Sequence, residues 1–156
     1  MTTALKMKKV WRVLVIEDNP DHWWLIRQAL ENNLSGVEPI WTSNPLTTIA
    51  YLEECAACRR RYPHLILLDL YLPDREAGMT MLRTLRQLPS AIQPIPIVVL
   101  SHSDRIEDIR ESYALGANSY IVKPLNDQGW QSHVQAITDY WWQSAIIPGI
   151  DPDHGR

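Results

Sequence analysis

The sequence predicts an α/β fold in which a five-stranded parallel sheet alternates with five helices and is wound on both faces. The first observation behind this prediction is that short apolar runs alternate along the chain with longer amphipathic stretches. The second is that these runs are apolar at nearly every position, which is typical of parallel strands covered on both faces. Such alternation within 156 residues favours one doubly wound domain.

Each predicted strand is a short apolar run. Val10–Ile16 and Leu65–Leu68 are apolar almost throughout, as expected for buried strands. Val37–Trp41 contains Pro39, which has no backbone N–H, so we expect this strand at a sheet edge. The two remaining strands are Ile95–Leu100 and Ser119–Val122.

Polar residues and prolines mark the start of the first two predicted helices. Asp21 is expected to cap a helix over Asp21–Asn32. Asn44 is expected to cap a second helix, which has Pro45 at its first position and ends near Arg60.

The three later helices are predicted from the spacing of their apolar residues. After the loop Leu70–Ala77, a helix runs to about Leu88. The next helix, Asp104–Leu115, is followed by Gly116 as its C′ residue, and the last runs from Asp127 to about Ser144. The residues that share an apolar face are Ile106, Ile109, Tyr113 and Ala114 in the former, and Trp130, Val134, Ile137 and Trp141 in the latter.

The composition excludes several classes of protein. Hydrophobic residues make up 46% of the chain and charged residues 21%, which excludes collagen, a coiled coil and wholesale disorder. A net charge of −3 gives no electrostatic basis for binding nucleic acid or an anionic membrane. No apolar run approaches the ~20 residues of a membrane span. The start lacks the apolar core of a secretory signal, so the two cysteines favour a reducing, cytoplasmic location.

Residues able to do chemistry follow four of the predicted strands. Glu17 and Asp18 follow the first strand, Asp69 the third and Ser101 the fourth, while Lys123 ends the fifth. The carboxyl ends of parallel strands share one rim, so these side chains are expected to gather there. Three carboxylates in one place repel one another, and a hard cation such as Mg²⁺ relieves that repulsion.

Four segments at these strand ends resemble the receiver domain of two-component response regulators. They read VLVIEDNP, LILLDLYLP, PIVVLSHSD and SYIVKPL, at the first, third, fourth and fifth strands. The resemblance covers residues 9–144, leaves residues 145–156 as a tail, and implies the flavodoxin-like receiver fold. It also implies a phosphoprotein that takes part in phosphorelay signal transduction.

The resemblance assigns a role to each acid at the rim. Asp69 matches the phosphoacceptor. Asp18 matches the carboxylate that binds Mg²⁺ directly, and Glu17 matches the second acid, which acts through water. The backbone carbonyl of Tyr71 matches the third protein ligand.

Three further residues match the parts of a receiver that respond to phosphorylation. Ser101 matches the hydroxyl that moves to the phosphoryl group, Lys123 the lysine that pairs with it, and Tyr120 the aromatic switch. The bond between Lys123 and Pro124 resembles the cis peptide of the family. The chemistry agrees, because Mg²⁺ and an ammonium group neutralise the charge that builds on the phosphoryl oxygens.

These residues predict a stand-alone response regulator that accepts a phosphoryl group from a histidine kinase on Asp69, with Mg²⁺. It would catalyse its own phosphorylation and dephosphorylation without being a conventional enzyme. Since no output domain fits after residue 144, we expect the signal to leave through contact with a downstream protein. The bulky Tyr71 and His102 are expected to shield the acylphosphate.

Two alternatives to this function stay open at the level of sequence. A pseudo-receiver would act as an interaction module that takes no phosphate, although the five rim residues argue against it. A small flavodoxin-like hydrolase or phosphatase would need a second acid after the nucleophile, or a base. Asp74 is too far along the loop for that role, and His102 is the only base in reach.

The end of the last helix suggests partners. Its aromatic residues and the following Ile-Pro tail resemble small cyanobacterial receivers that partner phytochrome kinases. The resemblance implies a phytochrome-type sensor histidine kinase and a homodimer through the fourth helix, fifth strand and fifth helix. Tyr140 and Trp142 lie off the core face and are expected to be exposed in this interface, together with Ala145–Ile150.

Overall fold

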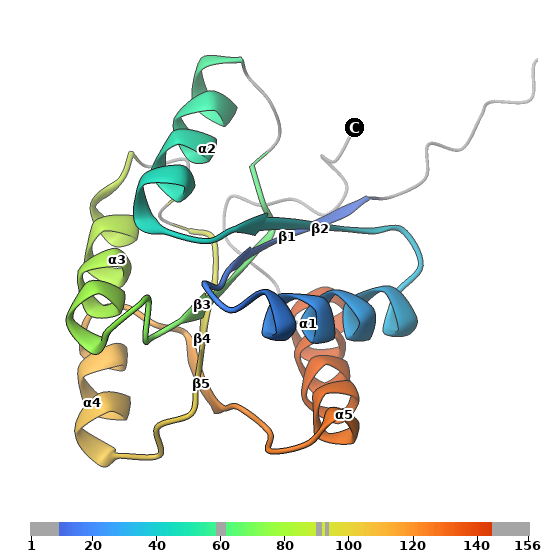
Figure 1. Ribbon diagram of the computed structural model, residues 1–156. Helices are drawn as coiled ribbons and strands as arrows, with labels where there is room; N and C mark the ends of the chain where they lie inside the picture. Colours follow the sequence, from blue (N-terminus) through green and yellow to red (C-terminus); the bar gives the residue numbers. More distant parts are fainter. Residues whose placement is uncertain (1–9, 59–61, 90–91, 93, 145–156) are drawn as a thin grey trace, which may run out of the picture.

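A single parallel sheet forms the centre of the protein. The computed structural model describes residues 10–58, 62–89, 92 and 94–144. Its strands are β1 (Trp11–Ile16), β2 (Val37–Thr42), β3 (Leu65–Asp69), β4 (Ile97–Ser101) and β5 (Ser119–Val122). They are all parallel, in the order β2-β1-β3-β4-β5 (Figure 1). The predicted five-stranded parallel sheet is confirmed, and Pro39 lies in an edge strand as predicted.

Helices cover both faces of the sheet. They are α1 (Pro20–Asn33), α2 (Pro45–Ala57), α3 (Arg75–Gln87), α4 (Ile106–Ala114) and α5 (Asp127–Thr138). In Figure 1, α2, α3 and α4 lie on one side of the sheet, and α1 and α5 lie on the other. This arrangement confirms the doubly wound α/β fold.

The cap of α1 differs from the prediction. Asn19, not Asp21, caps this helix, and its side chain accepts hydrogen bonds from the N–H groups of Asp21 and His22. Pro20 occupies the first helical position, where its lack of an N–H costs nothing, so the cap must be the residue before it. Asn44 caps α2 as predicted, although that helix ends at Ala57.

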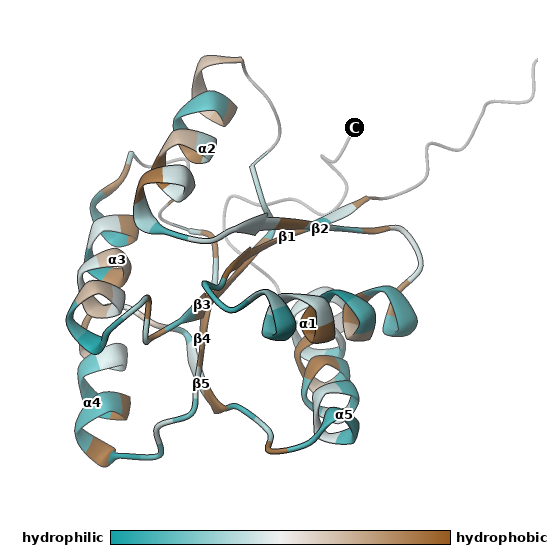
Figure 2. Ribbon diagram, viewed as in Figure 1, coloured by the Kyte–Doolittle hydropathy of each residue, from teal (hydrophilic) through white to brown (hydrophobic). Residues whose placement is uncertain are grey.

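Two apolar cores result from the alternation of side chains along the central strands. One core lies between the sheet and the helices α2 and α3, and it includes Leu14 and Leu82. The other lies between the sheet and the helices α1 and α5, and it includes Val13, Ile26 and Trp130. Figure 2 shows the hydrophobic colour concentrated along the central strands. Within the described segments, no helix has the length and apolar character that crossing a bilayer requires.

The helix α4 buries polar residues and exposes apolar ones. Asp108 and Ser112 are fully buried, whereas Ile106 and Tyr113 are 51% and 48% exposed. The apolar face that the spacing predicts for this helix is therefore not its buried face. The physical reason is position, because α4 packs beside the edge strand β5 and the helix α3, away from the centre of either core.

The chain changes helical type after α5. A π-helix runs over Asp139–Ser144, where the prediction continues one regular α-helix. Trp142 packs on Trp11 with ring centroids 5.1 Å apart and joins the core between the sheet and α1 and α5. The expectation that Trp142 is exposed is therefore wrong, while Tyr140 is 56% exposed. Residues 145–156, which include the predicted tail, lie outside the described residues.

Candidate functional site

Three carboxylates meet at the carboxyl edge of the sheet. Glu17 and Asp18 follow β1, and Asp69 is the last residue of the neighbouring strand β3. From β1 the chain continues to β2, and from β3 it continues to β4 on the opposite side of this strand pair. Doubly wound sheets bind ligands at the point where the connections diverge in this way. One oxygen from each carboxylate lies within 4.8 Å of the others, so the structure brings the three predicted acids together.

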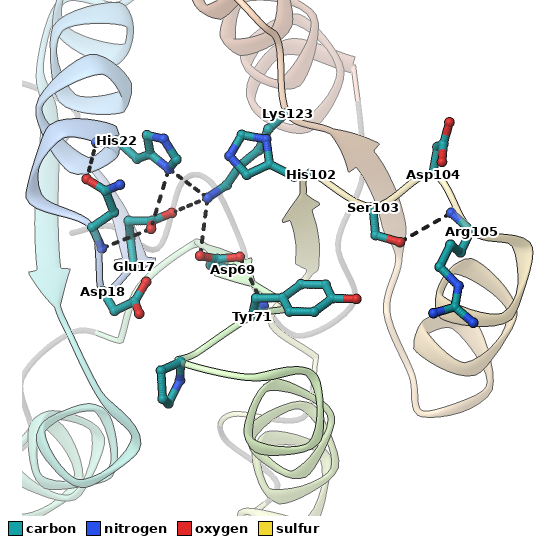
Figure 3. A pocket seen from close by; sticks show the side chains of 12 residues that line it. Glu17, Asp18, His22, Asp69, Tyr71, His102, Ser103, Asp104, Arg105 and Lys123 are labelled. Carbon is teal, nitrogen blue, oxygen red and sulfur yellow. Dashed lines mark hydrogen bonds and ion pairs between the residues drawn. The ribbon is translucent and has the colours of Figure 1, made fainter.

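Lys123 lies buried among these acids (Figure 3). Its Nζ donates a hydrogen bond to Glu17 Oε2 at 2.8 Å and pairs with Asp69 Oδ2 at 3.2 Å. It also lies 3.0 Å from His22 Nδ1. These three acceptors match the three N–H groups of the ammonium, so Lys123 is fixed beside the predicted phosphoacceptor.

His22 is a residue of this site that the sequence did not point to. An ammonium group can only donate, so Nδ1 of His22 must accept, and the ring proton then sits on Nε2. Burial and the charge of Lys123 lower the pKa of His22, which agrees with a neutral ring. The sequence feature that could have identified His22 is its position in the first turn of the helix that follows Glu17, because that end of the helix lies at the rim of the sheet.

The donor set fits Mg²⁺. Burial and the nearby Asp69 raise the pKa of Glu17 to about 7, although Lys123 opposes this shift. A bound cation would relieve that repulsion. Asp18 is exposed, which leaves its carboxylate free to bind a hydrated ion, and carboxylate oxygens are the ligands that Mg²⁺ prefers.

Ser101 and Tyr120 lie on adjacent strands beside the acids. Ser101 is fully buried, and its Oγ accepts a hydrogen bond from the N–H of Ser103 at 3.1 Å. The phenol of Tyr120 is half-buried and donates to the carbonyl oxygen of Ser103 at 2.7 Å. The residue two positions after Ser101 therefore contacts both predicted switch residues.

The loop after Asp69 is held close to the helix that follows it. The N–H of Tyr71 donates to Asp69 Oδ1 at 3.1 Å. Gly78 lies in α3 against Leu70, the residue directly after Asp69, and a Cβ on Gly78 would sit 1.5 Å from the carbonyl oxygen of Leu70. Only glycine permits this approach, so Gly78 fixes the backbone beside the acceptor.

The cis peptide bond of the described chain is Leu72–Pro73, so the expectation of a cis bond between Lys123 and Pro124 is wrong. The two isomers of an X-Pro bond differ little in energy, and sequence alone does not decide between them.

A cavity of about 640 Å³ opens over the site. Its walls include the three carboxylates, Lys123, Tyr71 and His102. The exposed His102 ring meets the ring of His22 edge to face, with centroids 5.2 Å apart. Asp69 therefore borders a cavity whose walls also carry two imidazoles and a phenol.

Comparison with known proteins identifies the family. Residues 13–135 match the response regulator receiver domain. The chain belongs to this family. This match confirms the predicted family. Receiver domains are partners of histidine kinases in two-component systems, bind Mg²⁺ at an acidic cluster and are not conventional enzymes.

Two relatives match along nearly their whole length. The probable methanogenesis regulatory protein FilR2 of Methanothrix harundinacea is 31% identical over 146 residues, which cover 94% of this chain and 93% of FilR2. The response regulator Rcp1 of Synechocystis sp. is 31% identical over 137 residues, which cover 87% of this chain and 92% of Rcp1.

Solved structures give the same picture. The phosphorylated cyanobacterial phytochrome response regulator RcpA superposes with a TM-score of 0.80 at 33% identity, over 90% of this chain and 99% of RcpA. The Mn²⁺-bound form of Rcp1 superposes with a TM-score of 0.77 at 30% identity, over 89% of this chain and 99% of Rcp1. The chain is thus similar to phytochrome response regulators in sequence and in fold.

Proposed function

We propose that this receiver accepts a phosphoryl group on Asp69 from a histidine kinase, in a Mg²⁺-dependent reaction, and signals by protein contact. The observation that carries the proposal is the position of Asp69, which lies within one cluster with Glu17 and Asp18 and 3.2 Å from the ammonium of Lys123. A pseudo-receiver has no need of this arrangement. The match across almost the whole of Rcp1 supports a regulator that acts through the receiver itself.

In the proposed reaction Asp69 is the nucleophile. One of its carboxylate oxygens bonds to phosphorus as the P–N bond to the kinase histidine breaks. The imidazole keeps the bonding electrons and takes a proton from water. Lys123 pairs with a phosphoryl oxygen, and the hydroxyl of Ser101 turns to donate to another. Tyr120 then follows Ser101 inward as the switch.

Asp18 and Asp69 would hold the ion directly, with the backbone carbonyl of Tyr71, and Glu17 would bind it through water. When bound, Mg²⁺ neutralises charge on the transferring phosphoryl group. The choice of Asp18 as direct ligand is supported by its exposure, whereas both oxygens of Glu17 already accept hydrogen bonds, from Asn19 N–H and from Lys123.

Intact mass after incubation with acetyl phosphate tests the proposal. We expect the wild type to gain one phosphoryl unit with Mg²⁺, and to gain none with a chelator or as Asp69→Asn. Asp127→Asn, which changes an exposed aspartate in the first turn of α5, is the matched control and should still gain it. A wild type that gains no mass from acetyl phosphate or from a cognate kinase would favour the pseudo-receiver.

We also propose that the kinase is of the phytochrome type, because RcpA is a phytochrome response regulator. Transfer of labelled phosphate from a panel of purified histidine kinases would test this, with fastest transfer expected from phytochrome kinases. The two free cysteines, Cys55 and Cys58, agree with a reducing compartment, and we propose that the protein acts in the cytoplasm.

We further propose a homodimer through α4, β5 and α5, with residues 9–144 as the receiver and residues 145–156 contributing to the contact. Exposed apolar side chains on α4 and β5 support it, namely Ile106, Tyr113 and Val122, as does the exposed Tyr140 in the π-helix that follows α5. Sedimentation at micromolar concentration, with and without beryllium fluoride as a phosphoryl mimic, should give a dimer mass. A monomer under both conditions would contradict the dimer without affecting the phosphoryl chemistry.

A further inference from the structure

A buried carboxylate on α4 holds together the two loops that flank the site. Asp108 is fully buried. Its Oδ2 accepts hydrogen bonds from the Tyr71 hydroxyl at 3.0 Å and from the Ser103 hydroxyl at 2.6 Å. Its Oδ1 accepts from Arg75 Nε at 2.5 Å. The donors come from the loop after β3, the loop after β4 and the first residue of α3.

Both hydroxyl donors are directly connected to the phosphorylation machinery. Tyr71 also donates its backbone N–H to Asp69 Oδ1. Ser103 donates its N–H to Ser101 Oγ, and its carbonyl accepts from the phenol of Tyr120. Side chains of Tyr71 and Ser103 line the cavity over Asp69. Asp108 itself does not line that cavity.

We propose that Asp108 is a positioning residue for the phosphoryl site, which fixes the ring of Tyr71 and the hydroxyl of Ser103 in the wall of the cavity that Asp69 also lines, and so sets the lifetime of the aspartyl phosphate. The hydroxyls of Tyr71 and Ser103 donate to the same oxygen, Asp108 Oδ2, so breaking either hydrogen bond changes the geometry of the other. Arg75 also pairs with Glu111, which adds a second tie from α3 to α4.

The proposal deepens the proposed function and rests on it for the lifetime of the phosphoprotein. With Tyr71 fixed, its ring limits the approach of water to the phosphorus atom. Loss of the tether lets the ring leave the cavity. The bond to be cleaved is the acyl P–O bond of phospho-Asp69, with water as the nucleophile, inorganic phosphate as the product, and the carboxylate restored.

The decisive measurement is the half-life of the phosphoprotein after removal of acetyl phosphate. Asp108→Asn keeps the shape of the side chain, and Tyr71→Phe keeps the ring but loses the hydroxyl. Each should shorten the half-life by about threefold to tenfold, which is the effect of one hydrogen bond. The double variant should be no faster than the faster single variant, because both changes act on the same hydrogen bond between Asp108 and Tyr71.

Glu107→Gln is the matched control, since it removes an exposed carboxylate from the same turn of α4 and should leave the half-life unchanged. Independent effects in the double variant, or unchanged half-lives in both single variants, would overturn the proposal. Should Asp108→Asn fail to fold, Tyr71→Phe carries the test alone.

A second readout needs no phosphate. NMR signals of the Tyr71 ring should shift in Asp108→Asn and not in Glu107→Gln, with both proteins unphosphorylated. Unmoved ring signals in a folded Asp108→Asn would also overturn the proposal. If the wild type takes no phosphate while Asp108→Asn still shows this shift, the result counts against the proposed function and leaves the contact between Asp108 and Tyr71 intact.

Discussion

The helices α4 and α5 are amphipathic to a similar degree in sequence, yet they are held to the protein by opposite kinds of contact. α5 buries Trp130, Val134 and Ile137 against the central sheet. α4 buries Asp108 and Ser112 and leaves Ile106 and Tyr113 half exposed. The spacing of apolar residues therefore shows which face of a helix is apolar. Whether that face is buried in the core depends on where the helix packs in the fold.

The difference has a consequence for dynamics. Contact between apolar side chains is non-directional and tolerates small shifts, whereas a polar contact is made or broken with the geometry of its hydrogen bonds. α4 is fixed by hydrogen bonds from the loops that flank the proposed phosphorylation site. Tyr71 connects Asp69 to α4 directly, because its N–H donates to Asp69 Oδ1 and its hydroxyl donates to Asp108 Oδ2.

Truncation in the α5 core is expected to have the largest effect. Trp130→Ala should lower the free energy of unfolding by about 4 kcal/mol, because it opens a cavity among buried side chains. Trp24→Ala is the matched control, since Trp24 is 58% exposed and its loss should cost under about 1 kcal/mol. Urea unfolding measures both. Equal losses in the two variants would contradict the packing described for α5.

Removal of the buried carboxylate of α4 should cost less. Asp108→Ala removes the acceptor of two hydroxyls and of Arg75 Nε and should cost about 2 kcal/mol in urea unfolding. Amide hydrogen exchange should increase in α4 and stay unchanged in α5. Equal increases in both helices would mean that Asp108 supports the whole fold rather than α4.

Acid should loosen α4 before α5. Burial raises the pKa of Asp108, but hydrogen bonds from Arg75, Ser103 and Tyr71 outweigh it and hold the pKa below the ordinary 3.8. The ionised carboxylate therefore contributes its full stabilisation above pH 3.8 and loses it as the pH falls through the lower folded-state value. The amide protection factors of α4 should decrease as the pH falls through the folded-state pKa of Asp108. In Asp108→Asn the same protection factors should not change over this pH range.

The smallest effect on folding is expected from the exposed face of α4. Ile106→Ser should change the free energy of unfolding of the monomer by about 0.5 kcal/mol or less, because Ile106 is half exposed. Val134→Ser in the core of α5 is the comparison and should cost several times more. If the proposed dimer forms, Ile106→Ser should weaken it in sedimentation. Strong destabilisation of the monomer would mean that Ile106 belongs to the core.

Much of the site could be anticipated from the chain because strand ends in a parallel sheet share a rim. Glu17, Asp18, Asp69 and Lys123 each follow or end an apolar run, and the structure brings them together. His22 was missed because its part in the site depends on the rotation of α1 about its axis. Asp108 was missed because a carboxylate in a short helix is usually exposed.

The sequence by itself determined the order of strands and helices along the chain, the edge position of β2 and the set of acids at the rim. Local features encode these, namely apolar runs, capping residues and a proline without an N–H. Only the tertiary structure decided which face of α4 is buried, that Trp142 packs on Trp11, and that Asp108 joins two loops. Each of these depends on which elements become neighbours, and packing over the whole molecule, not local periodicity, sets that.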